Sequence, residues 1–174
     1  TVITSQASFQ QFEYGFMTWR SDTGEIVVYV ANNAGQVIAY PFNSYSYMPD
    51  NPITDTPPSG RVRPLFGFGK VWGNVPAVRQ ALGWAMSGEQ GLTMTFTYVG
   101  NNTYRFNIPN GSIISNVNNQ SWSVYSGNGT GGGSTGGSTG GTGGTVVGSV
   151  GIVPYANFVP NTITYTVFNG QTVT

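Results

Sequence analysis

The residue types that carry out most enzyme chemistry are missing from this sequence. It has no histidine and no cysteine, which excludes Ser-His-Asp triads, histidine bases, thiol nucleophiles and the usual zinc sites. Paired carboxylates could still flank a glycosidic bond, and the candidates are Glu13, Asp22, Glu25 and Glu89. Asp22 and Glu25 lie in a turn-like sequence, so turn formation and solvation are the preferred explanation of that pair. We therefore predict no enzyme, with no catalytic, metal-binding or cofactor-binding residue.

A short glycine motif at residues 67–70 (Gly-Phe-Gly-Lys) superficially suggests a phosphate loop. It lacks the longer glycine spacing and the final Lys-Ser/Thr of such loops. We predict a tight turn there, in which glycine lets two backbones approach closely.

Charge is unusually scarce in this chain. Charged residues make up 7% of it, and six basic groups balance six acidic ones. A nucleic-acid partner needs a basic excess and is not predicted, and no apolar run is long enough to predict a membrane span. Since a protein near zero net charge tends to associate with itself, copies of the same chain are the expected partners.

The charges also divide the chain. All of them lie between Glu13 and Arg105, and residues 106–174 carry none. A charge-free stretch rich in Asn, Gly, Ser and Thr fits an extracellular or cell-surface location. We predict a globular module over residues 1–125, a Gly/Ser/Thr-rich segment over 126–148, and a C-terminal β segment over 149–174.

The local patterns predict a mainly β fold. Residues 16–20 and 25–30 read as a hairpin and 36–40 as a third strand, and further short strands are expected at 92–99, 103–108, 112–117 and 121–125. One short helix is expected from Val75 to Ala85, with Asn74 as its cap, and residues 41–64 read as a proline-rich loop. The expected architecture is an antiparallel sheet module, sandwich or barrel-like, followed by the Gly-rich segment and a C-terminal strand.

Three stretches together resemble an uncharacterised module of exported proteins from filamentous, often thermophilic bacteria. The first begins at Phe12 and reads F-E-Y-G-F-M-T-W-R, and the second begins at Gly67 and reads G-F-G-K-V-W. The third begins at Val78 and reads V-R-Q-A-L-G-W-A, and a Glu-Gln pair follows it at 89–90. The resemblance covers about residues 9–91. It implies an extracellular context and brings no catalytic role with it.

The tryptophans of these motifs have two possible roles. Trp19, Trp72 and Trp84 are expected to build the core of the module. The alternative is that they stack on sugar rings, together with Trp122 and the ten tyrosines. Glu13 is expected to pair with Arg20 or Arg79, and Glu89 with Lys70.

Glycans are a second candidate partner. Four Asn-x-Ser/Thr sequons occur at Asn101, Asn110, Asn119 and Asn128, although chance occurrence in an Asn/Ser/Thr-rich segment is the preferred explanation. Candidate O-glycan sites lie in a small-residue context; they are Thr130, Ser134, Thr135, Ser138, Thr139, Thr142 and Thr145.

The C-terminal segment contains a two-faced strand pattern without a protecting charge. Its residues are Thr162, Ile163, Thr164, Tyr165, Thr166, Val167 and Phe168. This strand could pair with the next subunit and give head-to-tail growth, or it could fold back on its own domain. The sequence favours an extracellular structural protein, a subunit of a surface filament or coat that assembles by β-strand pairing. The alternative is a cell-wall or glycan-binding module of a larger exported protein.

Overall fold

The computed structural model describes residues 1–31, 35–109, 111–116 and 120–125, together with the strand residues 145–146, 165–166 and 172–173. Its β-strands are β1 (Val2–Phe12), β2 (Gly15–Arg20), β3 (Ile26–Val30), β4 (Gln36–Tyr40), β5 (Gln90–Gly100), β6 (Thr103–Ile108), β7 (Gly111–Asn116), β8 (Ser121–Tyr125), β9 (Thr145–Val146), β10 (Tyr165–Thr166) and β11 (Thr172–Val173). Its helices are α1 (Phe42–Tyr45), α2 (Phe66–Asn74) and α3 (Pro76–Leu82).

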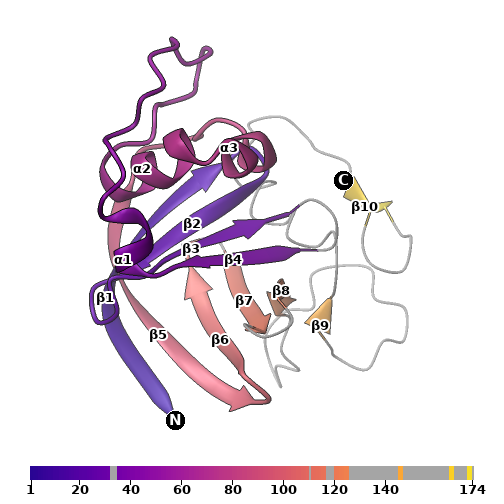
Figure 1. Cartoon of the computed structure of the whole chain (residues 1–174). Helices are drawn as coiled ribbons and strands as arrows, with labels where there is room; N and C mark the ends of the chain where they lie inside the picture. The colour runs from indigo at the N-terminus through magenta and orange to yellow at the C-terminus, as the bar shows by residue number, and fades with distance from the viewer. Residues whose placement is uncertain are drawn as a thin grey trace.

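The first eight strands form a closed antiparallel barrel (Figure 1). Two four-stranded meanders, β1–β4 and β5–β8, are joined by the long pairing of β1 with β5. The barrel closes where β4 meets β8, through the single register pair Gln36↔Ser121. The mainly β, barrel-like prediction is therefore confirmed.

The barrel interior is filled by aromatic rings. Phe16 stacks on Tyr29 with ring centroids 4.5 Å apart, and Trp122 meets Phe16 edge-on at 5.3 Å. The Trp122 indole also donates to the Val30 carbonyl at 2.9 Å. These contacts tie β8 to β2 and β3 across the barrel, so side chains as well as backbone pairing hold it closed.

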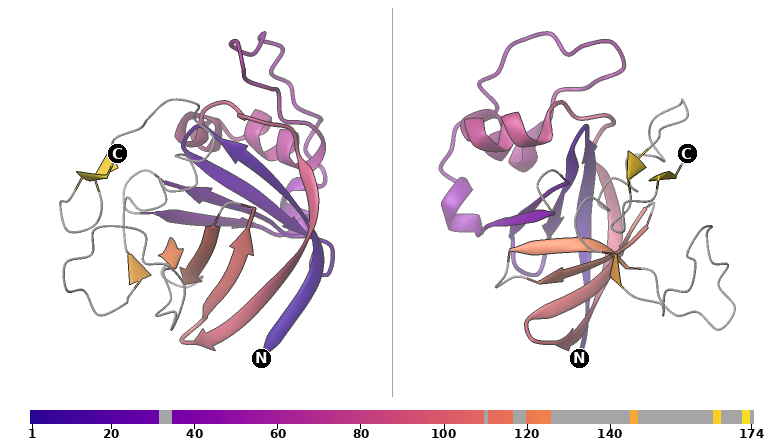
Figure 2. Two further views of the ribbon diagram at one scale, coloured as in Figure 1. Left: turned by 180° about the vertical axis from the view of Figure 1, so that it is seen from behind. Right: turned by 90° about the vertical axis from the view of Figure 1, so that its right-hand side faces the viewer.

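The helices form a layer on one side of the barrel (Figure 2) and enclose a second core against its outer face. Met17 and Val28 point into this second core, while their neighbours Phe16 and Tyr29 point into the barrel. All five residues of β3 are buried, since one face of the strand lines the barrel and the other lies under the helices.

Several elements differ from the sequence prediction. The described residues form three short helices where one was expected, and the Gly-Phe-Gly-Lys motif lies inside α2 and not in a tight turn. The expected helix is α3, but its N-cap is Val75, with no side-chain hydrogen bond at the cap. The Asn74 side chain instead donates to the carbonyls of Pro49 and Lys70.

The residues of the three sequence motifs join the helical layer to the barrel. Trp72 is 1% exposed, and its indole donates to the Gly83 carbonyl at 2.7 Å. One Glu13 carboxylate oxygen accepts the Trp84 backbone N–H at 2.7 Å, and the other lies 3.7 Å from Arg61. The expectation that Glu13 pairs with Arg20 or Arg79 was therefore wrong.

The predicted core tryptophans are not equally buried. Trp72 lies in the second core, whereas Trp84 and Trp19 pack against that core and are only partly buried. Among the described residues, no helix combines the length and apolar character needed to cross a membrane.

Candidate functional site

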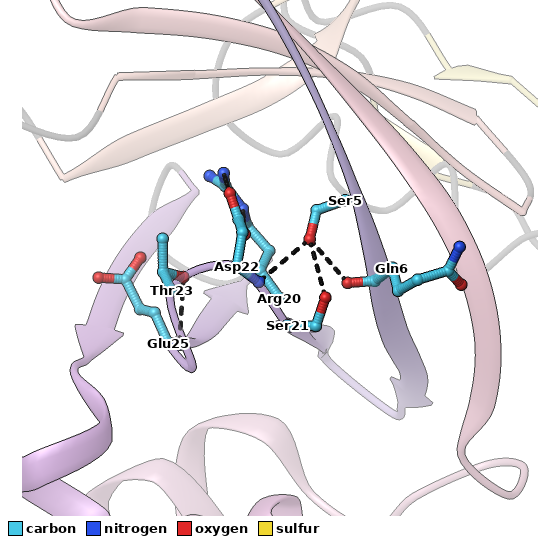
Figure 3. A network of polar contacts seen from close by, with 7 residues as sticks. All are labelled: Ser5, Gln6, Arg20, Ser21, Asp22, Thr23 and Glu25. Atoms are coloured by element: carbon cyan, nitrogen blue, oxygen red, sulfur yellow. Dashed lines mark hydrogen bonds and ion pairs between the residues drawn. The ribbon is translucent and has the colours of Figure 1, made fainter.

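The carboxylates Asp22 and Glu25 lie at the turn between β2 and β3, at one end of the barrel (Figure 3). Arg20 binds the Asp22 carboxylate through two hydrogen bonds, of 3.0 and 2.6 Å. The Ser5 hydroxyl, on β1, accepts the Asp22 backbone N–H at 3.3 Å and donates to the Gln6 carbonyl at 2.8 Å. These bonds fix the turn that carries Asp22 against β1.

The two carboxylates of this turn have opposite pKa shifts. The hydrogen bond from Arg20 lowers the pKa of Asp22. Burial raises the pKa of Glu25, and the nearby Arg20 offsets part of that effect. The ionised form of Asp22 therefore stabilises the fold, whereas the ionised form of Glu25 destabilises it.

We expect Glu25→Gln to raise the melting temperature slightly at pH 7. Because its pKa is raised, the ionised Glu25 carboxylate lowers the stability of the folded state above that pKa. This loss of stability disappears as the pH falls and Glu25 becomes protonated. Asp22→Asn should lower the melting temperature at pH 7, because the stabilisation by ionised Asp22 is present above its usual pKa and is lost in acid. Thermal melts of both variants from pH 7 to pH 3 check this, and shifts of the same sign would contradict it.

A second feature is a groove of about 520 Å³ between the outer face of the barrel and helices α1 and α2. Trp19 of β2 and Ile26 of β3 line it from the barrel side, and the two helices contribute four aromatic residues. Its lining residues are Ser8, Trp19, Ile26, Phe42, Tyr45, Ser46, Asp50, Phe66, Gly67, Phe68, Lys70 and Glu89. Sites for small ligands commonly have this size and this mixture of apolar and polar lining.

Local contacts position the aromatic rings of the groove. The Tyr45 hydroxyl donates to the Gly24 carbonyl, which attaches α1 to the β2–β3 turn. Phe42 packs edge-on against Tyr45, with ring centroids 5.7 Å apart. A Cβ added at Gly67 would lie 3.1 Å from Ile26, so this glycine lets α2 pack closely on β3.

Two of the groove's phenylalanines are unusually exposed. Phe42 is 59% exposed and Phe66 is 77% exposed. Phe66 also has φ +53°, a conformation that is rare for a bulky side chain and costs free energy. Exposed aromatic rings and backbone strain both occur preferentially at binding sites. The groove is therefore the stronger candidate site of the two.

Three charged side chains lie at the groove: Asp50, Lys70 and Glu89. The Lys70 ammonium donates to the Ser46 carbonyl at 3.1 Å. Asp50 and Glu89 are exposed, and neither forms an ion pair within the described part of the chain. The predicted pair of Glu89 with Lys70 is therefore not formed, although both residues line the same groove.

No family model matches this chain, and comparison with curated proteins and with solved structures found no match. The functional interpretation therefore depends on the geometry of the groove.

The other predicted site residues lie mostly outside the described residues. Asn101 is exposed at the turn between β5 and β6, whereas Asn110, Asn119 and Asn128 are not described. Of the candidate O-glycan residues only Thr145 is described, in β9. Of the predicted assembly strand, Tyr165 and Thr166 form β10 and pair with β11. Glycosylation and assembly stay predictions.

Proposed function

We propose that residues 1–125 form a carbohydrate-binding module of an exported surface protein, and that the groove holds a stretch of polysaccharide. The aromatic lining of this groove, with Phe42 and Phe66 exposed outside both cores, is the observation that carries the proposal. Aromatic faces suit the apolar faces of sugar rings. Hydroxyl and carboxylate groups such as those of Ser8 and Asp50 can bind the sugar hydroxyls.

Phe66→Ala should weaken polysaccharide binding at least about tenfold, which is roughly 1.4 kcal/mol. Tyr47→Ala is a matched control, because Tyr47 is equally exposed, at 77%, but does not line the groove. The measurement is co-sedimentation of the folded protein with insoluble cellulose, chitin and bacterial cell wall. Equal binding by the two variants, or no binding by the wild type, would contradict the proposal. Release of soluble reducing sugar would instead indicate a glycosidase that uses groove carboxylates.

A filament subunit is a second proposal, and the seam of the barrel favours it. The edge of β8 that meets β4 at Ser121 also pairs with β9, a two-residue strand later in the chain. The register pairs are Val124↔Val146 and Tyr125↔Thr145. This edge therefore accepts a strand from outside the barrel. Strand addition of that kind can also link copies of a chain.

Deletion of residues 149–174 should abolish fibre formation if the predicted strand at 162–168 joins subunits. The deletion leaves β1–β9 intact, so the melting temperature should change little. Electron microscopy and thermal melts of the full and shortened chains at equal concentration test this. Fibres formed by the shortened chain would refute the proposed role of the strand, and loss of the folded barrel would mean that the tail belongs to its own domain.

A further inference from the structure

The charges around the groove give more information about its ligand. The whole chain has 12 charged side chains, six basic and six acidic. Three of them line the groove, namely Asp50, Lys70 and Glu89. Two of these three are acidic, so the groove has a net charge of about −1. A sugar that carries carboxylate or sulfate groups would be repelled there.

The single basic group at the groove already has a partner. Lys70 donates to the Ser46 carbonyl at 3.1 Å, an interaction that links α2 to the end of α1. Asp50 and Glu89 form no hydrogen bond or ion pair through their carboxylates with any described residue. The two carboxylates are therefore free to bind a cationic group on a ligand.

The aromatic lining favours the same kind of ligand. An ammonium group over an aromatic face is attracted by the ring, and a carboxylate forms a charge-assisted hydrogen bond with it. From this juxtaposition we infer that the groove selects polysaccharides with free amino groups, that is, de-N-acetylated hexosamine polymers. This inference rests on the proposed function and specifies its ligand.

The test is isothermal titration calorimetry with three oligosaccharides of equal length, made of glucosamine, N-acetylglucosamine and glucose, at a pH where the glucosamine amine is protonated. We expect the glucosamine oligomer to bind at least about tenfold more tightly than the other two. The preference should fall as salt is added, because the carboxylates are exposed.

Variants separate the inference from the proposal on which it rests. The double variant Asp50→Asn with Glu89→Gln should lose the preference for glucosamine, so that its affinities for the three oligomers become about equal. Phe66→Ala should weaken binding of all three oligomers. Asp55→Asn is the charge control, because Asp55 is exposed but does not line the groove.

Three outcomes would overturn the inference alone: equal affinity for all three oligomers, a preference that survives in the double variant, or displacement of the glucosamine oligomer by an equal concentration of oligolysine. Absence of binding by all three oligomers, and by the polysaccharides used for co-sedimentation, would overturn the proposed function itself.

Discussion

Trp72→Ala is expected to lower the free energy of unfolding by about 3 to 5 kcal/mol, as large-to-small changes of buried aromatic residues do. Trp72 is 1% exposed and packs on Trp84 with ring centroids 5.1 Å apart. Its indole also satisfies the Gly83 carbonyl, at the end of α3. The change therefore leaves a cavity and an unpaired carbonyl in the layer that joins the helices to the barrel.

Guanidinium unfolding followed by far-ultraviolet circular dichroism measures this effect. Trp72→Phe is the conservative comparison, because it keeps most of the ring packing and removes the hydrogen bond to Gly83, which costs about 1 kcal/mol. Tyr47→Ala, at a 77% exposed position, should change stability by no more than about 0.5 kcal/mol. A loss below about 1 kcal/mol for Trp72→Ala would show that the helical layer is not packed as described.

Gly15→Ala is expected to destabilise the fold by about 3 kcal/mol or more, at the upper end of the cost of overpacking. A Cβ at this position would lie 1.9 Å from the Tyr29 carbonyl oxygen and 2.7 Å from the Leu82 side chain. The Leu82 side chain could move, but the Tyr29 oxygen belongs to the backbone of β3. Gly15 pairs with Val30 at the start of β2, so relief of the clash would disturb the β2–β3 pairing.

Gly91→Ala is the matched control for this change. Gly91 is also a strand glycine, in β5, and a Cβ there would meet no atom within 4 Å. Its replacement should be neutral or slightly stabilising, because alanine has less conformational freedom to lose on folding. Denaturant midpoints of the two variants give the comparison, and similar effects at both glycines would contradict the pairing of Gly15 with Val30.

The elements that the sequence predicted well are those with a strong local signal. Residues 16–20, 26–30 and 36–40 are dense in β-branched and aromatic residues and form β2, β3 and β4. The apolar run of β3 reflects burial on both faces, which could have indicated a covering layer of helices. The helix at α3 combines helical spacing with a proline in its first turn.

The elements that were missed depend on tertiary contacts. α2 contains glycines at 67, 69 and 73, which lower helix propensity. A Cβ at Gly69 would lie 2.6 Å from the Pro64 carbonyl oxygen, so close packing against the proline-rich loop requires glycine there and overrides the local preference. β1 alternates polar and apolar residues only loosely and gains its stability from pairing with both β2 and β5.

The groove could not be read from the sequence because its aromatic residues come from separate elements. Trp19 belongs to β2, Phe42 and Tyr45 to α1, and Phe66 and Phe68 to α2. No local pattern links these segments, and only the packing of the helices on the barrel brings them together. The one available signal was the motif residue Trp19, for which a core role was preferred and stacking on sugar rings was the alternative.

The most direct test of the account is a ¹H–¹⁵N NMR titration of the whole chain with a glucosamine oligomer. The account predicts shift changes concentrated at the groove, in the indole N–H of Trp19 and in the backbone amides of Gly67 and Glu89. The β5–β6 turn at Asn101 and Asn102, at the end of the barrel away from the helices (Figure 1), does not line the groove and should show little change. Absence of shift changes at saturating oligomer, or changes confined to that turn, would contradict the claim that the aromatic groove is the binding site.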